Sequence, residues 1–160
     1  MSSRFLVRAA VYAALYAALT LAPGLSALAY GQVQFRVSEA LMVFACFDPA
    51  AVVGLTAGCA VANLGSPMMP VDLVVGSALT LVAGAIMYMI GPRVTALAAP
   101  VIVNALGVAA MLALVLHLPY WASVVWVGAG EAAVLFTLGL ALLLVVRRRR
   151  DLFGLTRPVA

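Results

Sequence analysis

Charged residues are scarce in this sequence. Only nine basic and five acidic residues occur among 160, and lysine is absent, so all nine basic residues are arginines. Soluble domains have about 25% charged and about 45–50% apolar residues, whereas this chain has 9% charged and 67% apolar residues. These values exclude a water-soluble enzyme, a nucleic-acid-binding domain and a disordered chain. They predict an all-α membrane protein with several spans.

Cysteine, histidine and catalytic motifs are also scarce. Cys46 and Cys59 lie in apolar surroundings without a CxxC spacing, and His117 is the single histidine. We therefore expect no disulfide, metal site or cofactor, and interpret both thiols as small buried apolar groups. The sequence contains no Walker A loop, no HExxH motif and no GxSxG motif. These absences argue against an enzyme and against a complete ATP-driven pump.

Long apolar runs, separated by proline, glycine and polar residues, fill the chain. A membrane-spanning helix needs about 20 apolar residues, and proline cannot continue a helix interior. Breaks at Pro23-Gly24, Asp48-Pro49 and Gly91-Pro92 divide the runs. We expect a single integral membrane domain over residues 1–160, with a six-transmembrane-helix bundle and a basic tail. The helices are predicted at about 5–22, 37–47, 50–64, 71–90, 94–116 and 120–146, and the tail at 147–160.

The placement of the arginines predicts the orientation. Six spans put both termini on one side of the membrane, and with that side in the cytoplasm only Arg36 of the nine arginines lies outside, in agreement with the positive-inside rule. Both termini and the tail are therefore expected in the cytoplasm. The second and third runs are short, and a re-entrant hairpin with four true spans is the alternative. That hairpin would bury Asp48 at its tip, where an unpaired carboxylate costs several kcal/mol, so six spans are favoured.

Alanines recur at every fourth position of the first span. They form two neighbouring ridges, one of Ala9, Ala13 and Ala17 and one of Ala10, Ala14 and Ala18. Small residues at this spacing let the backbone of another helix approach closely in lipid. Two interpretations remain open: packing within the chain's own bundle, and docking of a partner protein.

Polar residues inside the predicted spans are candidates for ligand binding, because hydrocarbon does not solvate them. Glu131 lies 11 residues after Tyr120, which places it roughly 16 Å deep, near the middle of the membrane. Asn104 has a similar depth, one turn after Pro100. It either contacts a ligand or stabilises helix packing and the carbonyls freed by the proline.

Further polar and aromatic residues gather at the outer end of the predicted bundle. Glu39 follows Arg36 by three positions, where a surface ion pair would contribute little. Asn63 and Asp72 flank a loop, where they either cap helices or contact a ligand. Aromatic residues at this end either form an interfacial belt or stack on a ligand: Tyr30, Phe35, Tyr120, Trp121 and Trp126. The polar residues together predict a binding site that opens to the outside.

One stretch resembles a known family. Residues 31–42, GQVQFRVSEALM, resemble the QueT family. Members of this family are substrate-binding S-components of energy-coupling factor (ECF) transporters for queuosine precursors. The QFRVSEAL part is specific. The likeness extends over nearly the whole chain, through residues 54–63, 70–80, 100–105 and 130–131.

The resemblance implies a six-helix S-component in the plasma membrane that captures a 7-deazaguanine, such as 7-aminomethyl-7-deazaguanine or queuine, from outside. It also implies an energising module, formed by a transmembrane coupling protein and two cytoplasmic ATPases, that docks on the alanine-rich first span. A carboxylate can accept the ring N–H and the amino group of a guanine-type edge together, and a second carboxylate can neutralise an aminomethyl cation. The residues expected at the ligand are Glu131, Asn104, Glu39, Asn63, Asp72, Arg36, Tyr30, Phe35 and Trp121. The alternatives are an S-component for another vitamin or nucleobase, and a structural membrane protein whose polar groups only hold helices together.

Overall fold

The computed structural model describes residues 2–26 and 35–149. Every element in this part of the chain is a helix, and no strand occurs among these residues. The elements are α1 (Ser3–Leu21), η1 (Val37–Cys46), α3 (Pro49–Asn63), α4 (Met69–Val71), η2 (Asp72–Gly76), α5 (Ser77–Ile90), η3 (Val94–Leu97), α6 (Ala98–Leu116), α7 (Tyr120–Val134), η4 (Leu135–Gly139) and α8 (Leu140–Arg148). Of these, η1 and η3 are 3-10 helices, and η2 and η4 are π-helical turns. The predicted all-α class is confirmed.

Among the residues that the structure describes, six helical runs occur where the sequence predicts them, with ends within two residues of the predicted ones. Four are long and apolar enough to cross a membrane, namely Ser3–Leu21, Met69–Ile90, Val94–Leu116 and Tyr120–Arg148. The other two, η1 and α3, are apolar but have only 10 and 15 residues. Residues 150–160 of the predicted tail lie outside the described residues.

Local sequence signals explain several helix ends. The Asp48 side chain accepts the backbone N–H of Ala50 at 2.9 Å, and Pro49 occupies the first turn of α3, where a missing N–H costs little. Gly91 ends α5 with a φ of 81°, which glycine adopts without a steric penalty. His117 ends α6 in the left-handed region, with a φ of 55°. The single histidine therefore lies at a helix terminus.

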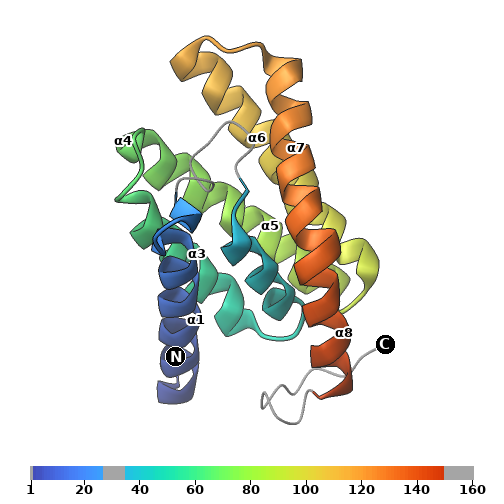
Figure 1. Cartoon of the computed structure of the whole chain (residues 1–160). Helices are drawn as coiled ribbons and strands as arrows, with labels where there is room; N and C mark the ends of the chain where they lie inside the picture. Colours follow the sequence, from blue (N-terminus) through green and yellow to red (C-terminus); the bar gives the residue numbers. More distant parts are fainter. Residues whose placement is uncertain (1, 27–34, 150–160) are drawn as a thin grey trace.

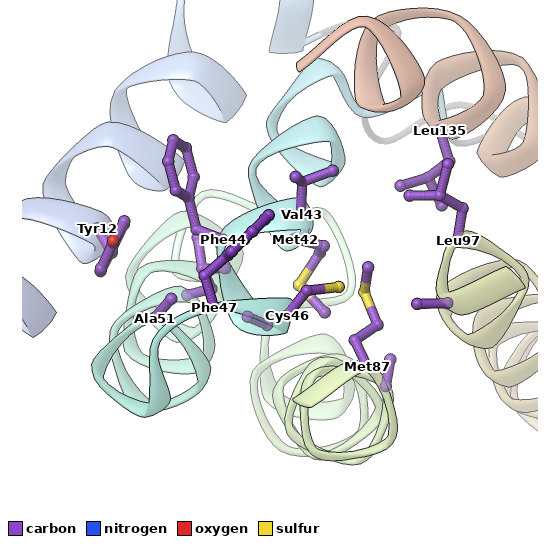
Figure 2. Close-up of a cluster of buried hydrophobic side chains, with 14 of the residues drawn as sticks. Tyr12, Met42, Val43, Phe44, Cys46, Phe47, Ala51, Met87, Leu97 and Leu135 are labelled. Atoms are coloured by element: carbon purple, nitrogen blue, oxygen red, sulfur yellow. The ribbon is translucent and has the colours of Figure 1, made fainter. Parts of the chain in front are cut away.

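The short helix η1 lies at the centre of the bundle. Eight of its ten residues are buried. A 3-10 helix rises about 2.0 Å per residue, so η1 extends about 20 Å, farther than an α-helix of equal length. Figure 2 shows the sulfur atoms of Met42, Cys46 and Met87 gathered between η1 and α5. On the other side of η1, the rings of Phe44 and Tyr12 lie 5.4 Å apart. The second apolar run is thus enclosed by the other helices.

The first alanine ridge packs against α3. A Cβ atom added at Gly58 would lie 2.6 Å from the carbonyl oxygen of Ala13. A Cβ atom at Gly54 would likewise collide with the backbone of Ala9. The two glycines therefore allow α1 and α3 to approach closely, as small residues do between helices in lipid. For Ala9 and Ala13 the structure supports packing within the bundle.

The second alanine ridge faces outward. Ala10, Ala14 and Ala18 are exposed, and Ala17 of the first ridge is half-buried. Large apolar side chains of the same helix are exposed around the second ridge: Leu6, Val7, Val11 and Leu15. A docking role for α1 therefore remains a prediction that concerns this outer ridge.

Successive helical runs alternate in direction, so the start of α1 and the end of α8 lie at the same end of the bundle (Figure 1). Asp48, in the turn between η1 and α3, is 2% exposed, and its Oδ2 atom lies 3.4 Å from Nε of Arg8 in α1. The Tyr12 hydroxyl also donates to Oδ2, at 3.4 Å. The burial cost of Asp48 was the reason to disfavour a re-entrant hairpin. In the structure Asp48 has an ion-pair partner and a hydroxyl donor, neither of which the sequence pattern indicated.

Candidate functional site

A cavity between the helices gathers most of the residues predicted to bind a ligand. Its walls come from η1, η2, α5, α6 and α7 and from the residue that precedes η1. The lining residues are Arg36, Glu39, Asp72, Gly76, Thr80, Asn104, Val108 and Glu131. Five of the nine residues predicted at the ligand lie here, although they are far apart in the sequence. A membrane bundle with polar groups concentrated in one internal cavity has the form of a ligand-binding protein.

Glu131 is held by one of its carboxylate oxygens. Asn104 of α6 donates its Nδ2–H to Oε1 of Glu131 at 2.7 Å. The other oxygen, Oε2, is buried and has no hydrogen-bond partner among the described residues. Asn104 therefore fixes the direction of the Glu131 side chain and leaves an acceptor available. Because a buried acceptor without a partner is costly, this oxygen favours the approach of a donor.

Glu39 has the same arrangement on the other side of the cavity. The hydroxyl of Tyr16, a fully buried residue of α1, donates to Oε1 of Glu39. Oε2 of Glu39 is buried and has no hydrogen-bond partner among the residues described. Two carboxylates from different helices are thus each anchored at one oxygen and open at the other.

Arg36 provides a positive charge at the same cavity. The expectation of a weak ion pair near the surface is wrong here, because Arg36 is 7% and Glu39 only 1% exposed. The charge of Arg36 interacts with both Glu39 and Glu131. The structural reason is that η1 is surrounded by other helices, so the residues at its start are enclosed as well. Buried charges are retained only with partners, and this cluster supplies them.

Asn63 and Asp72 act together at the wall formed by η2. The Nδ2 group of Asn63 donates to the backbone oxygen of Asp72 at 2.7 Å and contacts Sγ of Cys59, a free buried thiol, at 3.4 Å. The Asp72 carboxylate accepts a hydrogen bond from the hydroxyl of Ser66. Asp72 lines the cavity, whereas Asn63 lies behind it and holds the start of η2. A Cβ atom at Gly76 would lie 2.8 Å from Nδ2 of Asn63, so a larger residue there would displace the Asn63 amide.

The aromatic residues do not line this cavity in the part of the chain that the structure describes. Trp121 is 74% exposed on the outside of α7, in edge contact with Tyr120 at 5.0 Å between ring centroids. It lies ten residues from Glu131, about 15 Å along the helix. Phe35 is half-buried and is not a lining residue. Tyr30 falls outside the described residues. The exposed position of Trp121 agrees with the interfacial belt that the sequence left open as an alternative.

The cavity is narrow in this conformation. Only about 10 Å³ of it admits the centre of a water-sized sphere, which is about the space that one water molecule needs. A ligand larger than a water molecule can therefore enter only if the walls separate.

Four residues of the site were not singled out by the sequence reasoning, and one of them, Val108, is an apolar lining residue of α6. Gly76 and Thr80 line the cavity, and the Thr80 hydroxyl donates to the Gly76 carbonyl at 3.0 Å. The sequence indicates both only as part of the family likeness. Tyr16 anchors Glu39, and the signal for it was a polar stripe with a spacing of four that runs beside the alanine ridges. That stripe consists of Arg8, Tyr12, Tyr16 and Thr20.

Comparisons with known proteins agree with the resemblance. A family model described as QueT transporter matches residues 6–148. The protein described as queuosine precursor transporter QueT from Lactococcus lactis subsp. cremoris (strain MG1363) is 46% identical over 77 residues. That alignment covers 48% of this chain and 45% of the relative, so the matched part is just under half of each protein. No solved structure matches the chain. Since the family model covers most of the sequence, the chain belongs to the QueT transporter family.

Proposed function

We propose that this chain is the substrate-binding component of an ECF-type importer and that it captures a queuosine precursor, a 7-deazaguanine, from outside the cell. The observation that carries the proposal is the pair of buried glutamates, each anchored at Oε1 and without a partner at Oε2. Membership of the QueT transporter family and the name of the Lactococcus relative support the choice of ligand.

The donors of a 7-deazaguanine match these acceptors. Its guanine-type edge presents a ring N–H beside an exocyclic amino group. An ionised carboxylate accepts about four hydrogen bonds, so either glutamate still has room for two donors while it keeps its protein partner. Glu131 or Glu39 takes this edge, and the pairing is strong because the acceptor is charged.

The charge of the cavity favours a ligand with an amine. Glu39, Glu131 and Asp72 bring three carboxylates to the cavity, whereas Arg36 brings one guanidinium. An aminomethyl group at the 7-position carries a positive charge that the remaining carboxylates can neutralise. We therefore favour 7-aminomethyl-7-deazaguanine among the precursors.

The proposed topology is a single domain over residues 1–160 with six spans in the plasma membrane and both termini in the cytoplasm. Its support is that α1 begins and α8 ends at the same end of the bundle (Figure 1). The described arginines at those two termini are Arg4, Arg8, Arg147, Arg148 and Arg149. Arg36, by contrast, precedes η1 and lines the cavity. This distribution follows the positive-inside rule.

The proposed partner is an ECF energising module with a transmembrane coupling protein and two cytoplasmic ATPases. It docks on the outer alanine ridge of α1, formed by Ala10, Ala14 and Ala18. Support comes from the exposure of this ridge and from the apolar side chains around it. Small residues at a spacing of four allow a partner helix to come close.

Thermal unfolding of the protein purified in detergent tests the ligand. A saturating concentration of 7-aminomethyl-7-deazaguanine, about 100 times the Kd, should stabilise the wild type by about 2.7 kcal/mol. Glu131→Gln keeps the shape of the side chain but removes its charge, and should abolish most of the stabilisation by the ligand. Asp48→Asn is the matched control, because Asp48 is a buried carboxylate that does not line the cavity.

Other outcomes of this experiment decide between the alternatives. A wild type that no 7-deazaguanine stabilises contradicts the proposed ligand. Stabilisation by a different vitamin or nucleobase, lost in Glu131→Gln, assigns the S-component another substrate. If no compound stabilises the protein and Glu131→Gln merely unfolds at a lower temperature, the polar groups serve helix packing alone.

A further inference from the structure

One side of α1 is tied to η1 by a series of polar contacts. Near the start of α1, Arg8 lies 3.4 Å from the Asp48 carboxylate that follows η1. Near its end, the hydroxyls of Thr20 and Ser38 lie 2.7 Å apart at the start of η1. Since these contacts recur every fourth residue along α1, they form a single stripe that faces the central helix.

Tyr16 differs from the other members of this stripe in what its partner does. Tyr12 and Arg8 contact Asp48, which lies outside the cavity, whereas Tyr16 donates to Glu39, which lines it. Both Tyr16 and Glu39 are enclosed, with 0% and 1% of their surface exposed. The hydrogen bond uses Oε1, so the oxygen without a partner is Oε2.

A glutamate side chain has three rotatable bonds, and an unanchored carboxylate in a polar cavity would turn toward a positive charge. Arg36 lines the same cavity and interacts electrostatically with Glu39. The hydroxyl of Tyr16 opposes this attraction, because it donates from α1 to Oε1 of Glu39 and fixes that oxygen. Anchoring at one oxygen therefore determines where the other oxygen is presented.

We propose that Tyr16 is a positioning residue for ligand recognition, which acts by holding Glu39 at Oε1 so that Oε2 is presented to the ligand. The inference rests on the proposed function, because it assumes that the cavity binds a donor-bearing ligand. Tyr16 contributes to affinity without touching the ligand, in the way that pre-organisation of a binding group lowers the cost of binding.

A double-mutant cycle tests the proposal. The affinity of 7-aminomethyl-7-deazaguanine is measured by isothermal titration calorimetry for the wild type, Tyr16→Phe, Glu39→Gln and the double variant. Tyr16→Phe removes only the hydroxyl and should weaken binding about tenfold, because the Glu39 side chain must then be ordered when the ligand binds. In the Glu39→Gln background the same change should cost less than about twofold, because its effect passes through Glu39.

Tyr12→Phe is the matched control. It removes the same hydroxyl one turn earlier in the same stripe, from a partner outside the cavity, and should leave affinity within about twofold of the wild type. The thermal unfolding of each variant without ligand shows whether it is folded.

The inference and the proposed function fail in different ways. If the wild type binds and Glu39→Gln weakens binding, but Tyr16→Phe binds as tightly as the wild type, the inference is overturned and the function stands. Equal losses from Tyr16→Phe in both backgrounds also overturn it, because Tyr16 then acts independently of Glu39. If the wild type itself does not bind, the proposed function falls and the inference falls with it.

Discussion

At the scale of single residues, burial determines what the polar side chains of this chain can do. In water, a carboxylate oxygen is always hydrated, so its free lone pairs carry no selectivity. In the interior, Glu39 and Glu131 each have a protein partner at Oε1 but none at Oε2. A ligand donor that binds Oε2 removes the desolvation penalty of this buried acceptor. The two oxygens therefore favour a ligand that carries N–H groups.

Asn104 should influence ligand affinity through Glu131. Asn104→Leu preserves size but removes the donor to Oε1, so we expect about a tenfold weaker affinity for 7-aminomethyl-7-deazaguanine, equivalent to about 1.4 kcal/mol. Ser123→Ala removes another buried hydrogen-bonding group, outside the cavity, and should have no effect on affinity. Wild-type affinity in Asn104→Leu, measured by calorimetry, contradicts the anchoring role.

Sequence reasoning placed Glu131 and Asn104 at the same level of the bundle, as their hydrogen bond requires, but did not predict the contacts. Glu131 and Asn104 could be placed at similar depths because a helix converts sequence distance into depth at about 1.5 Å per residue. The contact between Tyr16 and Glu39 spans 23 positions and depends on how each helix is rotated about its axis. The alanine ridges occupy other sides of the same helix, and no local feature of the sequence pairs the polar stripe with Glu39.

At the scale of elements, the central position of η1 and the irregular turns around it shape the site. The breaks at proline and glycine predicted the helix ends well, because these residues disrupt helices through local sterics alone. No such local signal predicted the 3-10 geometry of η1 or the π-helical turn η2, which supplies Asp72 and Gly76 to the cavity. Tertiary packing sets these geometries, and π-helical turns are frequent at functional sites.

Close packing of α1 on α3 should depend on glycine. Gly58→Ala would bring a Cβ atom to 2.6 Å from the Ala13 carbonyl oxygen and 2.8 Å from Cβ of Tyr16. The two helices must then separate, at a cost of about 1–3 kcal/mol. We expect a lower unfolding temperature in detergent for this variant.

Gly84→Ala provides the comparison for this prediction. Its Cβ atom would lie 3.4 Å from Val52 and 3.5 Å from Met42, both at side-chain atoms in ordinary contact. Alanine is also the better helix former by roughly 1 kcal/mol, so stability should be unchanged or slightly raised. Equal unfolding temperatures for Gly58→Ala and the wild type would show that α1 and α3 are less tightly packed than the structure indicates.

At the scale of the whole molecule, composition and apolar runs were sufficient for the architecture. With so little charge, the membrane is the stable environment for each long apolar run. A helix satisfies its own backbone hydrogen bonds there, so the composition predicts the all-α class. The two short runs, η1 and α3, were harder to interpret because their length fits neither a full span nor a loop. Only the packed structure places η1 inside the bundle.

The outer ridge of α1 should be required for assembly with the energising module. Ala14 is exposed, so Ala14→Leu fills the groove that a partner helix needs and should abolish co-purification with the module while ligand affinity stays within about twofold. Ala141→Leu makes the same change at an exposed position of α8 and should leave co-purification intact. Persistent co-purification of Ala14→Leu would place the interface elsewhere.

The hydrogen bond from Tyr16 to Glu39 has a consequence for how the protein signals its state. Tyr16 and Ala14 are two positions apart, so their side chains leave α1 in nearly opposite directions. If Glu39 moved as the cavity filled, Tyr16 would carry that movement into α1, one helix width from the outer surface. Loaded and empty molecules would then present different exteriors to a neighbouring protein, without a long relay of side chains between the two.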